Sequence, residues 1–181
     1  MKSKFTLIIL TISIFLGSCD KLKELATIRI NTKFTAEIPV NMGVVPVKTS
    51  NSENIDIPLN FSEVHEIKLE DNFDIEPYLK KIKEIDISSV EIIAIGLEEG
   101  QVIHSVTLEV AGIGHILTLT NISADNNTFK PAIPQTLLDT VADKFITDKK
   151  ITISVYGSAN SPMSISVGVS LEAGVIAYVL K

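Results

Sequence analysis

The sequence predicts a mainly β fold, an antiparallel β-sandwich with one or two short helices. Apolar and polar residues alternate with a period of two over several segments, which is typical of half-buried strands. Turn-forming residues separate these segments, and only two stretches have the spacing of an amphipathic helix. Hydrophobic residues make up 45% and charged residues 21% of the 181 residues. This is the balance of a globular chain, and the length suits one domain.

The first half of the chain contains three predicted strands. Even positions in Ile28–Val40 are mostly apolar and odd positions mostly polar, and residues 55–61 repeat this alternation. A third strand begins at Ile85. Its apolar face changes sides near Ser88-Ser89, as it does at a β-bulge, where one extra residue reverses the alternation.

Alternation returns in the second half of the chain. Residues 106–110 alternate, and the two glycines in 111–114 predict a turn into a return strand that contains Leu117. Residues 151–155 form another alternating segment. Residues 157–162, Gly-Ser-Ala-Asn-Ser-Pro, have the composition of a loop.

The final apolar face is the longest, because it continues without a break from Met163 to Val179. At about 3.3 Å per residue this run would span roughly 55 Å, which is long for one straight strand. Gly168 and Gly174, on the other face, are candidate positions for a bend. We therefore expect a hairpin whose second strand bends and contributes to both sheets. The inward positions predicted for the whole domain are Phe34, Ile57, Leu108, Leu119, Ile153, Val167 and Val169.

Two segments depart from the β pattern. Glu76-Pro77 opens a short predicted helix, because proline suits the first helical position. The apolar residues on one side of it are Tyr78, Leu79, Ile82 and Ile85. Pro134 precedes a second helix of about three turns that ends near Lys149-Lys150. Its apolar stripe consists of Leu137, Leu138, Val141, Ala142 and Phe145.

The N-terminus has the organisation of an export signal. Lys2 and Lys4 precede the apolar run Phe5–Leu16, whose length is within the roughly 7–15 residues of a signal-peptide core. This run is shorter than the roughly 20 residues of a membrane-spanning helix. Leu16-Gly17-Ser18-Cys19 follows, and Cys19 is the only cysteine of the chain. A disulfide within the chain is therefore excluded.

Leu16-Gly17-Ser18-Cys19 resembles the lipobox of bacterial lipoproteins. The resemblance implies cleavage between Ser18 and Cys19 and a thioether-linked lipid on Cys19. It divides the chain into a signal peptide (1–18), a lipidated tether (19–27) and one β-sandwich domain (28–181). Several acyl chains hold a protein on a membrane far more firmly than one. The alternative is that Cys19 is a small apolar residue at the end of an ordinary secretory signal.

Charge and composition limit the possible partners. The formal net charge is −6, and it becomes −8 once Lys2 and Lys4 are removed with the signal. An acidic chain lacks the basic surface that nucleic acid requires. The chain has no tryptophan and 6% aromatic residues. It is therefore poorly supplied with the aromatic platforms that many glycan-binding domains use.

The sequence contains few candidates for chemistry. It has no catalytic motif of the nucleophile-elbow, phosphate-loop or zinc-protease type, so we expect no catalytic residues and no cofactor besides the lipid on Cys19. The weak candidates for a metal site are Asp71, Asn72, Asp74 and Glu76. A solvated turn is the alternative interpretation of this acidic patch.

Two further kinds of residue could form a site. His104 has the parity of Val106 and Leu108, and His115 has that of Leu117, so a shared metal site would be possible if the two strands pair. Tyr156, beside the 157–162 loop, is the single residue expected to form a contact surface. The alternatives are histidines at strand edges and a tyrosine that covers a sheet face.

The alternating strands between Ile85 and Val179 look like those of small, uncharacterised β-sandwich envelope lipoproteins of Gram-negative bacteria. This resemblance implies a non-catalytic binding or accessory domain held close to a membrane. Its partner could be a protein or a glycan. We expect an extracytoplasmic location, with the outer membrane favoured over the inner membrane. The chain also resembles fimbrillin-type pilus subunits, which assemble by strand exchange. Arg29, its only arginine, lies inside the first predicted strand.

Overall fold

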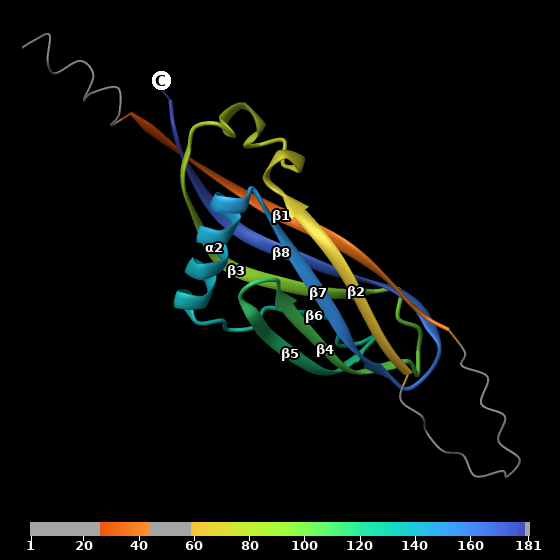
Figure 1. The fold of residues 1–181 in the computed structure, drawn as a ribbon. Coiled ribbons are helices and arrows are strands. Elements are labelled where there is room, and N and C mark those ends of the chain that lie inside the picture. The colour runs from red at the N-terminus through yellow and green to blue at the C-terminus, as the bar shows by residue number, and fades with distance from the viewer. Residues whose placement is uncertain (1–25, 44–58, 180–181) are drawn as a thin grey trace, which may run out of the picture.

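The computed structural model describes residues 26–43 and 59–179, which form two antiparallel four-stranded sheets packed face to face (Figure 1). The predicted mainly β sandwich is confirmed. The first sheet has the order β1-β8-β3-β6 and the second the order β2-β7-β4-β5. The predicted signal peptide 1–18, Ser18 and Cys19, the tether up to residue 25, and Ile55 and Ile57 lie outside the described residues.

The strand boundaries follow the alternation of the sequence. The first sheet consists of β1 (Thr27–Met42), β8 (Met163–Tyr178), β3 (Ile82–Ile95) and β6 (Thr128–Phe129). The second sheet consists of β2 (Leu59–Lys68), β7 (Lys150–Ala159), β4 (Val102–Val110) and β5 (Gly114–Ser123). In β1 every even residue from Thr32 to Met42 is buried, and the odd residues between them are exposed.

The prediction that the closing strand contributes to both sheets is wrong. β8 is one 16-residue strand that lies in the first sheet throughout, between β1 and β3. β7 lies in the second sheet, so residues 160–162 pass between the sheets and do not close a hairpin. The strand can be this long because β1 and β3, with 16 and 14 residues, give it hydrogen-bond partners along its length. The predicted loop is also shorter than expected, because β7 continues to Ala159.

The two glycines of β8 accommodate neighbouring side chains and do not divide the strand. A Cβ atom at Gly168 would lie 2.7 Å from Cγ2 of Ile93. A side chain at Gly174 would overlap the guanidinium group of Arg29, which crosses this position to pair with Asp86 at 2.7 Å. The missing side chains therefore permit two contacts across the outer face of the first sheet.

Register shifts explain where simple alternation fails. The predicted change of face in β3 is confirmed as an irregularity between Ile87 and Ser89, which leaves both Ile87 and Val90 buried. Other shifts lie between Ile82 and Glu84 in β3 and between Ile103 and Ser105 in β4. A further shift opposes two residues of β5 to one of β4 near His115. Leu119, predicted to point inward, is only half-buried.

One of the two predicted helices forms. Helix α2 (Gln135–Asp148) packs against β3 and β7, one strand from each sheet. Its Phe145 is fully buried and meets Phe34 edge to face, with ring centroids 4.8 Å apart. The first predicted helix is limited to the 3-10 turn η2 (Glu76–Tyr78), because Ile82 already pairs with Ala177 as the start of β3.

The segment 69–81 covers one end of the sandwich, which we call the Thr27 end (Figure 1). Thr27 pairs with Tyr178 there, and the amide of Tyr178 donates to the carbonyl of Lys81 at 2.9 Å. The segment begins with the 3-10 turn η1 (Leu69–Asp71), and it buries Leu69 and Ile75. The beginning of β1, the end of β8 and this cover therefore lie together.

Candidate functional site

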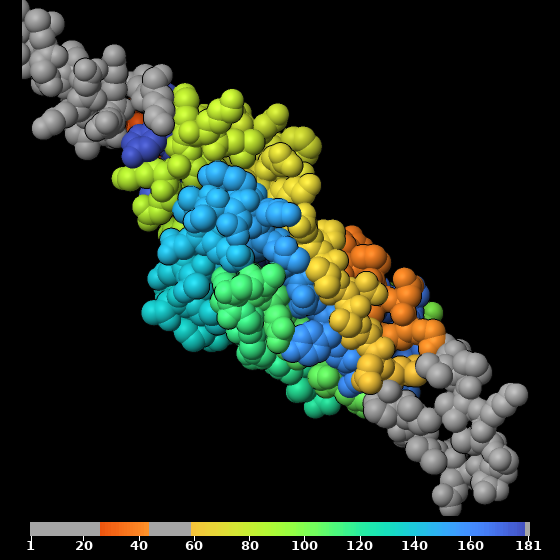
Figure 2. All heavy atoms as spheres, in the orientation of Figure 1, coloured from red at the N-terminus to blue at the C-terminus, as the bar shows by residue number. Residues whose placement is uncertain are grey.

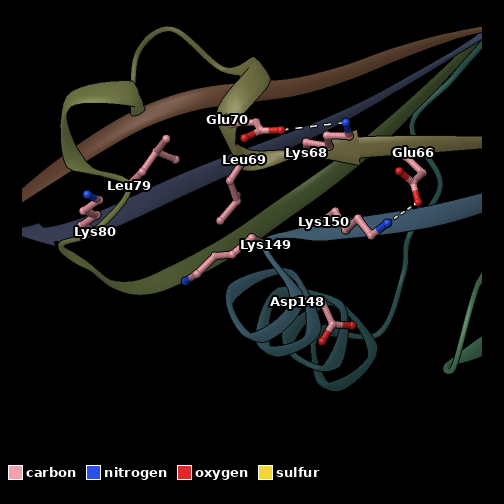
Figure 3. Close-up of a pocket in the computed structure, with 9 residues that line it drawn as sticks. All are labelled: Glu66, Lys68, Leu69, Glu70, Leu79, Lys80, Asp148, Lys149 and Lys150. Carbon is pink, nitrogen blue, oxygen red and sulfur yellow. Dashed lines mark hydrogen bonds and ion pairs between the residues drawn. The ribbon is translucent and has the colours of Figure 1, made fainter.

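A pocket of about 470 Å³ opens beside the 69–81 segment, where β2 ends and β7 begins (Figure 3). Three separate parts of the chain line it. They are the end of β2 with η1, the residues that follow η2, and the junction between α2 and β7. In Figure 2 the yellow-green atoms of the 69–81 segment border the blue atoms at the end of α2. The lining residues are Glu66, Lys68, Leu69, Glu70, Leu79, Lys80, Asp148, Lys149 and Lys150.

Backbone hydrogen bonds join two of these parts, the end of β2 with η1 and the junction between α2 and β7. Lys68 pairs with Lys150 at the last rung of the β2–β7 ladder. One residue further on, the amide of Leu69 donates to the carbonyl of Lys149 at 2.9 Å. That carbonyl is among those that the end of a helix leaves without an intrahelical partner. The pocket is therefore built on strand pairing and a satisfied helix end.

The pocket has an apolar floor and a charged rim. Leu69 is 1% exposed, and its side chain points into the space between η1 and α2 (Figure 3). Leu79 is half-buried on the opposite wall. Four lysines and three carboxylates surround them. The lining thus has an excess of positive charge in a chain whose net charge is −6.

The three carboxylates of the rim already have cationic partners. Glu66 pairs with Lys150 at 2.5 Å, and that ammonium group lowers the pKa of the Glu66 carboxyl below its ordinary value. Glu70 lies 3.8 Å from Lys68, and Asp148 pairs with Lys144 at 2.7 Å. Within residues 26–43 and 59–179, Lys80 and Lys149 form no ion pair. These two amines remain available to an anion.

Lys149 has an unusual backbone conformation. It follows the last residue of α2 with φ of 60° and ψ of 5°, in the left-handed region. Helices commonly end this way, but the residue is usually glycine because a Cβ atom is unfavourable there. In Figure 3 the Lys149 side chain extends from the junction of α2 and β7 in the direction away from Lys150. Lysine thus occupies a position where glycine would be less strained.

The acidic patch proposed as a weak metal site is largely engaged in structural hydrogen bonds. The hydroxyl of Thr32 donates to Asp74 Oδ2 at 2.6 Å, and Asn72 Nδ2 donates to the carbonyl of Lys33 at 2.9 Å. Asp71 and Glu76 are exposed. In the part of the chain that the structure describes, no three histidine, cysteine, aspartate or glutamate side chains are grouped to hold a metal ion. Asn72 and Asp74 attach the 69–81 segment to β1.

Tyr156 lies on the outer face of the second sheet, in a shallow depression of about 430 Å³. Its hydroxyl donates to Glu109 Oε1 at 2.7 Å, and this bond raises the pKa of the Tyr156 phenol above its ordinary value. The side chain covers β4 while one face remains in contact with solvent. The lining of this depression shares no residue with the lysine-lined pocket.

The two histidines of the β4–β5 pair do not meet. His104 is the extra residue at the β4 irregularity and is exposed, contrary to its parity with Val106. His115 pairs with Glu109, near the other end of β4. Five residues of strand separate these positions by roughly 16 Å. The prediction of a metal site shared by His104 and His115 is therefore wrong.

Comparisons with known proteins give no family for this chain. No family model matches it, and no curated protein matches it. A solved structure described as Desmodium yellow mottle tymovirus is similar with a TM-score of 0.35 and 8% sequence identity, over 84% of this chain and 91% of that chain. A similarity of this size carries no information on function. Within the described residues, no helix has both the length and the apolar character needed to cross a membrane.

The lysine-lined pocket was not among the sites expected from the sequence. Its lining comes from residues 66–70, 79–80 and 148–150, and no local pattern connects them. The feature of the sequence that could have indicated this pocket was the pair Lys149-Lys150, which we interpreted only as the end of a helix. Chemically, ammonium groups beside an apolar floor suit a ligand with a negative charge and an apolar part.

Proposed function

We propose that this chain is a non-catalytic lipoprotein of the bacterial envelope, whose β-sandwich is a binding or accessory domain held close to a membrane by a lipid on Cys19. The observation that carries the proposal is the lipobox-like sequence Leu16-Gly17-Ser18-Cys19 after an export-type apolar run. An outer-membrane location is part of this proposal.

The start of β1 supports a close tether. Among the described residues the first strand begins at Thr27, and residues 20–26 lie between it and Cys19 in the sequence. Fully extended, this length of chain reaches at most roughly 25–30 Å. A lipid on Cys19 would therefore keep the Thr27 end, with the lysine-lined pocket, near the bilayer.

The lipid anchor can be tested at the single cysteine. We expect metabolic labelling with a fatty-acid analogue to label the expressed full chain and not the Cys19→Ser variant. Intact-mass measurement should find the labelled form beginning at Cys19. Ser18→Ala, which keeps a small residue before the cleavage point, is the matched control and should be labelled as the parent chain is. Label retained on the Cys19→Ser variant would overturn the proposal.

A second candidate is an assembly subunit that polymerises by strand exchange. The observation that favours it is the position of β1, an edge strand that pairs with β8 alone in its sheet. Such a strand can leave a sheet without breaking the other pairs. Filaments sheared from expressing cells would support this candidate. Single membrane-bound particles after detergent extraction would support the accessory domain.

A further inference from the structure

We propose that the lysine-lined pocket binds a single-chain anionic amphiphile, a molecule with one alkyl chain and a phosphate or carboxylate headgroup. The alkyl chain would contact Leu79 and the methylene groups of the lining lysines, and the headgroup would pair with Lys80 and Lys149. This inference deepens the proposed function, on which it rests for the idea of a binding domain near a membrane.

The shape of the pocket fits such a ligand. Its volume of about 470 Å³ is within the range of roughly 300–1,000 Å³ found for small-molecule sites. Leu79, the residue after η2, is half-buried and is the apolar side chain that a ligand can reach, whereas Leu69 is buried (Figure 3). An alkyl chain can therefore lie along Leu79 and the methylene groups of the lining lysines.

The charged side chains of the lining determine whether the headgroup is an anion or a cation. Each carboxylate of the rim has a lysine within 4 Å, whereas Lys80 and Lys149 have no carboxylate partner among the described residues. The negative end of the α2 dipole lies nearby and opposes an anion. The Lys149 carbonyl is already bonded to the Leu69 amide, and four lysines outnumber three acids in the lining. The balance therefore favours an anion over a cation.

The position of the pocket indicates where such a ligand would come from. Lys80 is adjacent to Lys81, whose carbonyl accepts the amide of Tyr178 at the end where β1 begins. In a protein anchored through Cys19, this end would lie near the bilayer, whose molecules combine alkyl chains with polar headgroups. A free anion without an alkyl chain would use the lysines but leave Leu79 partly exposed to water.

The test is a binding titration on the chain from Asp20 onward, which contains every strand of both sheets. Decyl phosphate, kept below its micellar concentration, is the probe. Inorganic phosphate tests the charge without the chain, and decyl maltoside tests the chain without the charge. We expect decyl phosphate to bind at least tenfold more tightly than either. Equal binding of all three, or no binding of decyl phosphate, would overturn the inference.

Variants then locate the site. Lys149→Gly should weaken decyl phosphate binding at least fivefold, and its thermal midpoint should not fall because glycine suits the backbone at this position. Lys80→Ala should weaken binding similarly. Lys130→Ala, which removes a lysine paired with Glu91 outside the pocket, is the matched control and should bind as the parent does. Unchanged binding by both pocket variants would overturn the site.

These measurements distinguish the inference from the proposed function. Binding that depends on Lys149, together with an unlabelled Cys19 in the full chain, would refute the lipid anchor and leave the pocket intact. Labelling of Cys19 without decyl phosphate binding would refute the pocket and leave the anchor intact.

Discussion

Lys149 is the residue whose conformation conflicts most clearly with its type. Its left-handed φ of 60° places a Cβ atom where glycine is usual. Left-handed backbone costs an ordinary residue about 1–2 kcal/mol, and the greater freedom of glycine in the unfolded chain offsets part of the gain.

We therefore expect Lys149→Gly to leave the free energy of unfolding unchanged or raise it by up to about 1 kcal/mol. Urea denaturation of the parent and the variant measures this difference. A clear loss of stability would show that the contacts of the Lys149 side chain stabilise the fold by more than its backbone conformation costs.

Glu172 is the residue most suited to a test of pH dependence. Its carboxylate accepts hydrogen bonds from Lys33 Nζ at 2.9 Å and from the Ser89 hydroxyl at 3.0 Å, on the outer face of β8. The bond from Lys33 is the main reason that the pKa of Glu172 lies below its ordinary value of 4.5. A lowered carboxyl pKa stabilises the fold above pH 4.5, and this stabilisation is lost as the pH falls through the folded-state pKa.

We expect Glu172→Gln to reduce the fall in the urea midpoint between pH 6 and pH 3. The effect should be small, because the pair is on the surface and salt screens it. Glu98→Gln, in the loop between β3 and β4, is the control and should leave the pH profile unchanged. An identical profile for Glu172→Gln would contradict the assigned role of this carboxylate.

At the scale of the element, β8 determines whether the first sheet exists. It is the only strand that joins β1 to β3, and its Val175 and Ala177 are fully buried. A chain that ends after Glu172 loses these core residues and the partners of Thr27 to Thr32.

We expect that truncated chain to be insoluble or unfolded, as judged by size-exclusion chromatography and circular dichroism. A chain that lacks only residues 180 and 181 is the control and should fold. A folded, monomeric truncated chain that binds the missing peptide in trans would favour the strand-exchange candidate.

Elements were predictable where the pattern within one segment decides the structure. The alternation of β1, the stripe of α2 and the change of face near Ser88-Ser89 were correct, because each depends on neighbours within a few residues. The sheet to which β8 belongs was not predictable. It depends on the length and register of β1 and β3, which lie far away in the chain.

At the scale of the whole molecule, one core between the two sheets supports the fold. Leu108 is 2% exposed and pairs with Val155 and Leu117 in the second sheet. Loss of a buried leucine side chain costs about 2–5 kcal/mol, through lost burial and the cavity that remains.

We therefore expect Leu108→Ala to lower the free energy of unfolding by about 2–5 kcal/mol in urea denaturation. Thr107→Ala, on the outward face of the same strand, should change it far less. A loss below 1 kcal/mol for Leu108→Ala would contradict its place in the core.

The lysine-lined pocket also belongs to the scale of the whole molecule. Two of its three lining segments, 66–70 and 148–150, meet because β2 pairs with β7 and because the Leu69 amide bonds to the Lys149 carbonyl. The sequence showed Tyr156 and the acidic patch, since each is local, but neither contributes a residue to the lining of this pocket. A surface site that forms through strand pairing between distant segments has no local sequence pattern from which it could be predicted.

The pairing of β1 with β8 also determines when the first sheet can form during synthesis of the chain. β1 is the first of the described strands to be synthesised and β8 the last, and β1 has no other partner in its sheet. Contacts between residues this far apart in the chain slow folding. β1 can therefore pair with β8, and the first sheet can close, only after the ribosome has made every other described element. For a chain that leaves the cytoplasm unfolded, such a delay would keep the polypeptide competent for export until it has crossed the membrane.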